Sequence, residues 1–350
     1  GEWEKCKLGD ACNVFMCKRI LATQTNTEGG VPFYKIRTIG GTPDAYISKE
    51  LFDDYKTKYN YPHKGEVMIT CAGTVGKCVI YDGKDAYYQD SNIVWIDNPS
   101  QYIGNGFLYH LLANVDWRKL NSTTIIRIYN DDLRNLKLSY PQIEEQKKIS
   151  RLLSLLDDRI STQNKIIEKL ESLIKGIAQN IVRYNKPNVR LSDCLSCSSS
   201  TLQESDVSEH GTYPVYGANG VVGYLDNYNT ENEAIYIIKD GSGVGSTSYV
   251  TGKCSATGTL NILRAKEGYS LQYLYYMLKV FNFEPYKTGM AIPHIYFKDY
   301  GKAKVFCPTY KEQLQYARLL SAIDKRLTVE HGLLTSLSLQ KQYLLRQMFI

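Results

Sequence analysis

Apolar residues recur along two stretches of the chain at alternating steps of four and three positions. The first stretch lies between Pro141 and Pro187, and its seam consists of Ile149, Leu153, Leu156, Ile160, Gln163, Ile167, Leu170, Ile174, Ile177 and Ile181. A constant shift of 167 positions gives the second seam, which consists of Tyr316, Leu320, Ile323, Leu327, Glu330, Leu334, Leu337, Lys341, Leu344 and Met348. This spacing is typical of coiled-coil helices. We predict two helices of about 42 residues, each about 60 Å long.

Each seam is interrupted near its middle by a polar residue, Gln163 in the first helix and Glu330 in the second. The first helix leads from one half of the chain to the other, so a second helix that returns would run antiparallel to it and bring these two residues together. Buried polar seam residues fix the register of paired helices, and we assign this role to Gln163 and Glu330. Gly176 and Gly332 weaken the helices locally and are expected to mark bends or packing points. A helical bundle would explain the stripes too, but other long helices are too few to build one.

The two helix starts belong to a tandem duplication of the chain. Residues 141–159 and 308–326 are identical at nine of 19 positions. A weaker match pairs residues 72–94 with 241–263 at a shift of 169, with six of 23 positions identical. Because both matches keep the same order and nearly the same shift, the chain consists of a globular domain, a helix, a globular domain and a helix. The predicted boundaries are 1–141, 142–186, 187–307 and 308–350.

Both globular halves combine short strands with short helices. The predicted elements are strands at 67–70, 77–81, 234–238 and 246–250, helices at 106–114 and 271–281, and glycine turns at 73–76 and 241–245. The turn glycines are expected to adopt positive φ. The fold class is therefore α+β, with two globular domains in a pseudo-twofold arrangement, separated by an antiparallel pair of long coiled-coil helices.

Motifs for catalysis and metal binding are missing. The turn at 73–78 resembles a phosphate loop but lacks its first glycine, and Cys78 stands where Ser or Thr would bind magnesium. Cys194 and Cys197 form a CxxC pair, but no second pair completes the four ligands of a structural zinc site. The motifs of hydrolases, metalloproteases and amino-methyltransferases are absent as well. We therefore predict no catalytic residue, metal or cofactor in this chain.

The net charge of +6 is only a weak hint toward nucleic acid. Divided by segment, it is +1, +3, −1 and +3 for the four predicted segments, so the globular halves are near neutral. A DNA-binding face would have to be assembled by folding. The sequence has no apolar run of membrane-spanning length and no apolar signal core at its start, so a cytoplasmic protein is expected.

The globular halves are rich in side chains that hydrogen-bond base edges and phosphates, and the chain has 29 tyrosines. Most of these side chains also suit ordinary strands. The candidate DNA contacts are Lys35, Arg37, Thr38, Lys77, Gln89, Ser91, Arg127 and Tyr129 in the first half, and Lys239, Ser246, Lys253, Thr257, Lys287 and His294 in the second.

Several motifs together carry a family resemblance. They are the Pro-x-x-x-Glu-Gln-x-x-Ile segment at 141–149, the Arg-Leu-Leu-Ser-Leu-Leu-Asp-Asp-Arg run at 151–159, their copies at 308–326, and the closing Leu-Leu-Arg-Gln-Met-Phe at 344–349. With them, essentially the full chain resembles the specificity subunits of type I restriction–modification enzymes. Tyr316 and Lys341 stand where the first helix has Ile149 and Ile174, so the symmetry of the helices is imperfect.

The resemblance implies two target-recognition domains, each of which reads one half of a split double-stranded DNA site. The helices would act as a spacer and as the docking platform for two methyltransferase subunits, and motor-nuclease subunits would complete the complex. The resemblance places S-adenosylmethionine, ATP and magnesium in these partner subunits, so the chain itself is not an enzyme. The candidate docking residues are Glu145, Arg151, Asp157, Glu312, Arg318 and Asp324.

Two other functions are consistent with parts of the pattern. A coiled-coil scaffold whose globular ends bind proteins or another ligand would show the same duplication, but it would not bind DNA with any partner. A nuclease and methyltransferase fused in one chain would need methylation motifs that are missing here. A helix of 60 Å matches about 18 base pairs, which suits two readers that contact separate half-sites.

Overall fold

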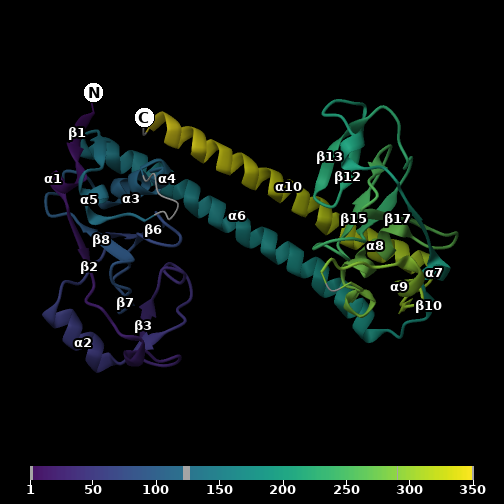
Figure 1. Ribbon diagram of the computed structural model, residues 1–350, viewed down its shortest axis with the longest axis horizontal. Coiled ribbons are helices and arrows are strands. Elements are labelled where there is room, and N and C mark those ends of the chain that lie inside the picture. Colours follow the sequence, from purple (N-terminus) through teal and green to yellow (C-terminus); the bar gives the residue numbers. More distant parts are fainter. Residues whose placement is uncertain (1–2, 121–126, 290, 349–350) are drawn as a thin grey trace. The chain divides into compact units, whose positions relative to one another are not determined.

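The computed structural model describes residues 3–120, 127–289 and 291–348, and it divides into two compact units. Unit 1 consists of Gly1–Ser161 with Thr335–Ile350, and unit 2 consists of Thr162–Leu334. Each unit therefore holds one globular domain and a part of both long helices (Figure 1). Phe349 of the closing motif lies outside the described residues. The segment boundaries derived from the sequence stay a prediction.

The globular domain of unit 1 is built from short strands and helices that precede the first long helix. Its elements are β1 (Glu4–Lys7), α1 (Leu8–Ala11), β2 (Asn13–Met16), η1 (Ala22–Gln24), β3 (Val31–Tyr34), β4 (Tyr46–Ile47), α2 (Lys49–Lys58), β5 (Val67–Thr70), β6 (Cys78–Ile80), β7 (Tyr87–Tyr88), β8 (Ile93–Asp97), α3 (Asn105–Ala113), α4 (Trp117–Leu120), α5 (Asn130–Arg134), β9 (Lys137–Tyr140) and then α6 (Ile143–Tyr184).

The globular domain of unit 2 repeats this order of elements except that no helix corresponds to α2 among its described residues and a 3-10 helix takes the place of α4. Its elements are β10 (Val189–Arg190), α7 (Leu191–Cys194), β11 (Leu195–Ser199), η2 (Glu204–Asp206), β12 (Tyr213–Gly217), β13 (Gly220–Leu225), β14 (Ala234–Ile238), β15 (Thr247–Val250), β16 (Ser255–Ala256), β17 (Leu260–Ala265), α8 (Leu271–Lys279), η3 (Glu284–Tyr286), α9 (Phe297–Tyr300), β18 (Lys304–Val305) and then α10 (Tyr310–Met348). The predicted strands, short helices and long helices are confirmed, with shifts of one or two residues at their ends.

The sheets of the two units have the same topology. In unit 1 an antiparallel sheet has the order β2-β8-β5-β6, and in unit 2 its counterpart has the order β11-β17-β14-β15. A smaller sheet joins one antiparallel and one parallel pair in each unit, with the orders β4-β3-β7 and β13-β12-β16. The duplication read from the sequence therefore extends to strand pairing, including regions where the two halves share little sequence.

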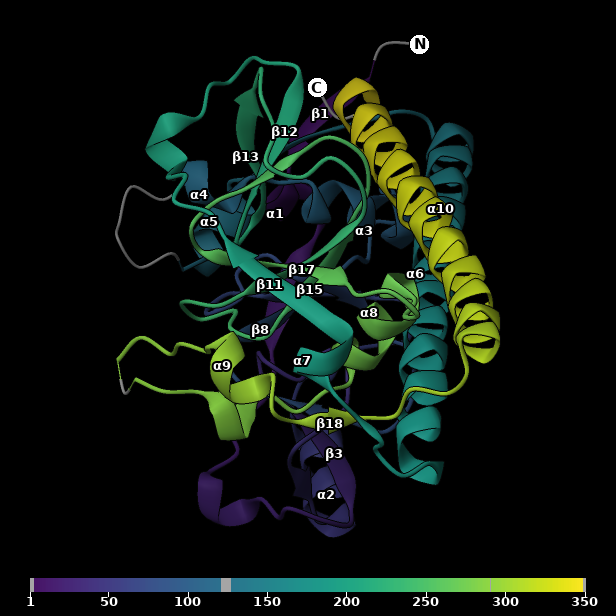
Figure 2. The ribbon, with the colours of Figure 1, turned by 90° about the vertical axis from the view of Figure 1, so that its right-hand side faces the viewer.

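The central strands β5 and β14 are buried on both faces, because successive side chains of a strand point to opposite sides. In β5, Val67 and Ile69 contribute to a core with α3, the start of α6 and the end of α10, whereas Met68 packs in a second core with β3, β4 and α2. In β14, Ile235 and Ile237 contribute to a core with α8, the end of α6 and the start of α10. Figure 2 shows α8 between this sheet and the long helices.

The predicted glycine turns have the expected conformation at the residue that ends each turn. Gly76 has φ +83° and Gly245 has φ +92°. A Cβ on Gly76 would lie 2.3 Å from Cδ1 of Trp117, and one on Gly245 would lie 3.0 Å from Cδ2 of Phe283. Both glycines therefore combine a backbone conformation that favours glycine with an aromatic ring that leaves no space for a side chain.

A buried glutamine ties each long helix to a short helix of its own unit. The side chain of Gln146 accepts a hydrogen bond of 2.8 Å from the backbone N–H of Gly104, the residue before α3. It also donates to the carbonyls of Tyr102 and Pro141. Gln313 accepts from the N–H of Ser270 before α8 at 2.9 Å and donates to the carbonyl of Pro308. These contacts explain why the glutamine of the Glu-Gln motif recurs at the start of both long helices.

The two seam breaks meet, as predicted. Within unit 2, Gln163 Nε2 donates to the carboxylate of Glu330 and, at 3.1 Å, to its backbone carbonyl. Both side chains are about 2% exposed or less. The turns of α6 that follow Gln163 share a core with the turns of α10 that precede Glu330, so the two helices run antiparallel in unit 2. Gly176 and Gly332 are not the packing points that the sequence suggested, because nothing lies within 4 Å of a Cβ placed on either.

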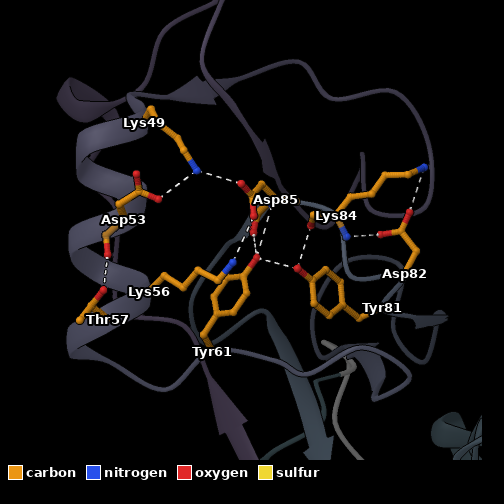
Figure 3. Close-up of polar contacts among 10 residues, drawn as sticks. Lys49, Asp53, Lys56, Thr57, Tyr61, Tyr81, Asp82, Lys84 and Asp85 are labelled. Carbon is orange, nitrogen blue, oxygen red and sulfur yellow. Dashed lines mark hydrogen bonds and ion pairs between the residues drawn. The ribbon is translucent and has the colours of Figure 1, made fainter.

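Helix α2 of unit 1 has no counterpart in the described part of unit 2, and polar contacts hold it in place (Figure 3). Asp85 accepts hydrogen bonds from Lys49 at 2.8 Å and from Lys56 at 3.1 Å, and both lysines belong to α2. These contacts lower the pKa of Asp85. Tyr61 and Tyr81 share a hydrogen bond of 2.9 Å beside this ion-pair network. The inserted helix is therefore fixed to the loop before β7.

Candidate nucleic-acid interface

Three segments meet at the same end of the large sheet in unit 1. Residue 71 follows β5, residues 89–92 precede β8, and residues 127–129 precede α5. The N–H of Cys71 donates to the carbonyl of Asn92 at 2.7 Å, and the N–H of Ile128 donates to the carbonyl of Cys71 at 2.9 Å. We call residues 35–39, 71–77, 89–92 and 127–129 loop cluster 1. It contains all eight DNA-contact candidates of the first half.

The turn at 35–39 brings basic side chains to loop cluster 1. The N–H of Lys35 donates to the hydroxyl of Thr38 at 3.0 Å, which closes the turn. Asp44 lies 3.1 Å from the Lys35 ammonium and 3.8 Å from the Arg37 guanidinium. The Arg37 side chain is 82% exposed, so this weak ion pair leaves its charge in solvent. The turn thus presents Lys35 and Arg37 beside the Asp44 carboxylate.

Hydrogen bonds connect Gln89 and Lys77 to this turn, and another connects Arg127 to Ser91. The Gln89 side chain accepts from the N–H of Ile36 at 3.4 Å, and the Lys77 ammonium donates to the carbonyl of Ile39 at 2.5 Å. Arg127 donates to the carbonyl of Ser91 at 3.2 Å, and Ser91 has φ +54°. Residues that are up to 94 positions apart along the chain, Lys35 and Tyr129, are therefore placed in one loop cluster.

Unit 2 repeats the arrangement in loop cluster 2, defined as residues 239–246, 257–259, 287–289 and 291–296. The N–H of Lys239 donates to the carbonyl of Thr259 at 3.0 Å, and the N–H of Ile295 donates to the carbonyl of Lys239 at 2.9 Å. The Thr257 and Thr259 hydroxyls are hydrogen-bonded at 2.8 Å. His294 Nδ1 lies 2.6 Å from the Asp240 carboxylate. The candidates in this cluster are Lys239, Ser246, Thr257, Lys287 and His294.

Lys253 belongs to a different part of unit 2. Its ammonium lies 4.8 Å from the ring centroid of Tyr228 and 5.9 Å from that of Tyr213. A hydrogen bond with Tyr228 raises the pKa of Lys253. The structure therefore brings five of the six candidates of the second half into loop cluster 2 and places Lys253 beside an aromatic pair instead.

The docking candidates on the long helices fall into two groups. Glu145, Arg151 and Arg318 are exposed, and Glu312 accepts hydrogen bonds from the backbone and hydroxyl of Thr309 at the start of α10. Asp157 and Asp324 are half-buried and contact side chains of their own units. Asp157 contacts Lys341 and His110, and Asp324 contacts Tyr276 and Lys279. The docking role of all six stays a prediction.

Sequence reasoning missed two residues of loop cluster 2, and it named Asp240 together with Lys239 without predicting the contact of Asp240 with His294. The missed residues are Thr259, whose carbonyl accepts from the N–H of Lys239, and Tyr296, which is exposed. Tyr296 carried a signal, because Ile128-Tyr129 recurs as Ile295-Tyr296 at the same shift of 167 as the helices. No pattern in the sequence indicates the contact of Asp240 with His294, since the two residues are 54 positions apart.

The described residues hold no candidate metal site and no candidate membrane span. Within 3–120, 127–289 and 291–348, no three His, Cys, Asp or Glu side chains are grouped so that they could hold a metal ion. Burial raises the pKa of Cys197 to about 11, which suits a structural thiol. Across the same described residues, no helix is both long enough and apolar enough to cross a membrane.

Comparison with known proteins adds a family to this geometry. The family described as type I restriction modification DNA specificity domain matches residues 1–172 and 188–339. A Haemophilus influenzae protein named as a type I restriction enzyme specificity subunit is 48% identical over 180 residues, which are 51% of this chain and 46% of that protein. A Methanocaldococcus jannaschii protein named as the MjaX specificity subunit is 25% identical over 193 residues, 51% of this chain and 45% of that protein. The chain thus aligns with about half the length of these relatives.

A solved structure shares the fold over nearly the whole chain. The crystal structure of a type I restriction–modification system S subunit from M. genitalium aligns with a TM-score of 0.73. The alignment covers 99% of this chain and 96% of that chain, at 18% sequence identity. The predicted α+β class with two globular domains and two long helices is confirmed.

Proposed function

The chain belongs to the family of the type I restriction modification DNA specificity domain, and from this premise we propose that it is the DNA-sequence-reading subunit of a type I restriction–modification complex, without catalysis of its own. One observation carries the proposal. Each unit places a cluster of polar loops at the same end of the same sheet, and the two clusters carry different side chains. A repeated scaffold with two different surfaces suits a DNA site with two different halves.

Each loop cluster would contact one half of a split double-stranded DNA site. The cations of loop cluster 1, chiefly Lys35, Arg37, Lys77 and Arg127, suit phosphates and guanine edges. Loop cluster 2 offers the cations Lys239 and Lys287 together with hydroxyl groups and the imidazole of His294. The four predicted segments and the pseudo-twofold arrangement of the two domains are part of the proposal, because the antiparallel helices would hold the two domains in opposite senses.

The starts of the long helices would bind two methyltransferase subunits. Arg151 and Arg318 are exposed at equivalent positions of the repeat. Their neighbours Leu152 and Leu319 are 42% and 51% exposed, and exposed apolar side chains beside an arginine are typical of protein interfaces. The methyltransferase subunits would supply S-adenosylmethionine, and motor-nuclease subunits would supply ATP and magnesium. A cytoplasmic location follows for a complex that acts on cellular DNA.

Co-expression with a methyltransferase subunit of a type I restriction–modification system from the same genome tests this function. We expect a stable complex and, from single-molecule sequencing of the host DNA, a newly methylated motif with two defined halves and a gap of fixed length. Cells that express the methyltransferase alone are the control and should lack the motif. A stable complex without sequence-dependent methylation or DNA binding would contradict the proposal. A chain that binds neither methyltransferase nor DNA would support the scaffold function instead.

A further inference from the structure

An exposed tyrosine occupies the same position in both units. Tyr129 and Tyr296 are separated by the repeat shift of 167 and directly precede α5 and α9. They are 61% and 48% exposed. Each ring lies near a cation, with Arg127 Cζ 5.8 Å from the Tyr129 centroid and Lys298 Nζ 5.3 Å from the Tyr296 centroid.

The backbone fixes both tyrosines at the same point of the scaffold. The preceding residues, Ile128 and Ile295, are 2% and 1% exposed. Their N–H groups donate at 2.9 Å to the carbonyls of Cys71 and Lys239, the first residues after the central strands β5 and β14. Because an apolar anchor and a backbone hydrogen bond are both repeated, the residue before each anchor is held in the same place in both units.

The residue before the anchor differs, and so does its chemistry. It is Arg127 in unit 1 and His294 in unit 2. Both are half-buried, and each is oriented by a neighbour, because Arg127 donates to the carbonyl of Ser91 and His294 Nδ1 contacts the Asp240 carboxylate at 2.6 Å. An ionised carboxylate can only accept, so Nδ1 of His294 carries the proton in this contact. In the neutral ring, Nε2 is then left as a hydrogen-bond acceptor.

These two side chains are complementary to different base edges. A guanidinium has five N–H donors and can bond both O6 and N7 of guanine while it keeps a protein contact. An imidazole nitrogen that accepts is complementary to an exocyclic amino group, N6 of adenine or N4 of cytosine. On the basis of the proposed function, we propose that Arg127 and His294 are the equivalent base-reading positions of the two domains. Arg127 reads a guanine and His294 reads an exocyclic amino group, and Tyr129 and Tyr296 bind the DNA backbone beside them.

The test uses the complex of the full chain with its methyltransferase and duplexes that contain the mapped site. Binding is measured for every single-base-pair change in the site. We expect Arg127→Ala to abolish the preference at one G·C pair of one half-site, and His294→Ala to abolish the preference at one pair of the other half-site. Each lost preference should amount to about 5- to 100-fold in affinity.

Base analogues separate the two chemistries. Replacing the guanine read by Arg127 with 7-deazaguanine should weaken binding of the unaltered protein but not of the Arg127→Ala variant. At the pair read by His294, the analogue lacks the amino group: purine replaces adenine, or 2-pyrimidinone replaces cytosine. This analogue should weaken binding of the unaltered protein but not of the His294→Ala variant. Tyr129→Phe and Tyr296→Phe should weaken binding to all duplexes alike, by about 2- to 10-fold, with base preferences unchanged.

Matched variants control for folding and for general loss of charge. Arg134→Ala and His210→Ala remove an arginine and a histidine at exposed positions outside the loop clusters. Tyr184→Phe is the corresponding control for the two tyrosine variants. All three controls should bind DNA like the unaltered protein. His294→Gln keeps the size of the side chain and serves if His294→Ala unfolds. Unchanged base preferences in the Arg127 and His294 variants, with a split site still recognised, would overturn this inference and leave the proposed function standing. An unaltered complex that prefers no sequence would overturn both.

Discussion

At the scale of single residues, Gln146 and Gln313 show how one side chain can join two elements. Both are buried, at 1% and 2% exposure, and both use the amide oxygen to cap a short helix and the amide nitrogen to bond the chain before a long helix. A buried amide whose partners are lost is costly, because those partners cannot reach water. The two glutamines therefore hold the junction between each domain and its helix.

Gln146→Ala and Gln313→Ala should each destabilise one unit by about 1–3 kcal/mol. The loss should be local, with faster hydrogen exchange in α3 for the first variant and in α8 for the second. Gln179→Ala, at an exposed position of α6, is the control and should change stability by about 0.5 kcal/mol or less. Equal exchange rates in the control and in Gln146→Ala would show that the capping contact is dispensable.

His110 makes the stability of unit 1 depend on pH. Burial lowers the pKa of His110 below its usual value, and the Asp157 carboxylate offsets only part of this effect. On acidification the unfolded chain therefore binds a proton near pH 6.5, whereas the folded chain binds it only at lower pH. The contribution of the neutral ring to stability is complete above about pH 6.5 and declines below it.

The unfolding free energy should consequently fall between pH 7.5 and 5.5, by at most about 1.4 kcal/mol per pH unit from this group. Urea unfolding at several pH values measures the slope. His110→Gln should show a smaller slope over this range, and His210→Gln, at an exposed position, should keep the slope of the unaltered chain. A slope that does not respond to His110→Gln would assign the pH dependence to other groups.

At the scale of elements, the starts of α6 and α10 combine contacts within the protein with a face that is left exposed. Asp157 and Asp324 bond to side chains of the same unit, and Glu312 caps α10 through Thr309. Reversing the charge of these residues would disturb folding as well as docking. Arg151 and Arg318 are exposed at equivalent positions and are the sharper test of the docking face.

Arg151→Glu and Arg318→Glu together should weaken the complex with the methyltransferase by about tenfold or more, because desolvated charges at an interface contribute several kcal/mol when they are reversed. Each single change should remove one of two bound copies. Lys165→Glu, an exposed charge reversal on α6, is the matched control. Size-exclusion chromatography with light scattering gives the stoichiometry, and a complex of unchanged size and affinity in the double variant would refute this docking face.

At the scale of the whole molecule, the sequence predicted the repeated parts well and the composition of the loop clusters less well. The long helices, their antiparallel pairing and the contact of Gln163 with Glu330 follow from heptad spacing, which is a local pattern. The support of His294 by Asp240 and of Arg127 by Ser91 depends on segments that are 54 and 36 positions apart. Such contacts depend on the order of the strands in the sheet, and no periodic sequence pattern predicts them. The sequence around Lys253 gives no sign of its contact with Tyr228, which is 25 positions away.

The central claim is that the paired helices set the distance between two DNA-reading domains. The most direct measurement inserts one heptad into α6 before Gln163 and one into α10 after Glu330. In an antiparallel pair these two insertions face each other, so the seam stays in register. The methylated motif of the resulting complex is then mapped. Seven residues add about 10 Å of helix, so the account predicts the same two half-sites with a gap longer by about three base pairs. A functional complex that still methylates the original motif with the original gap would contradict it.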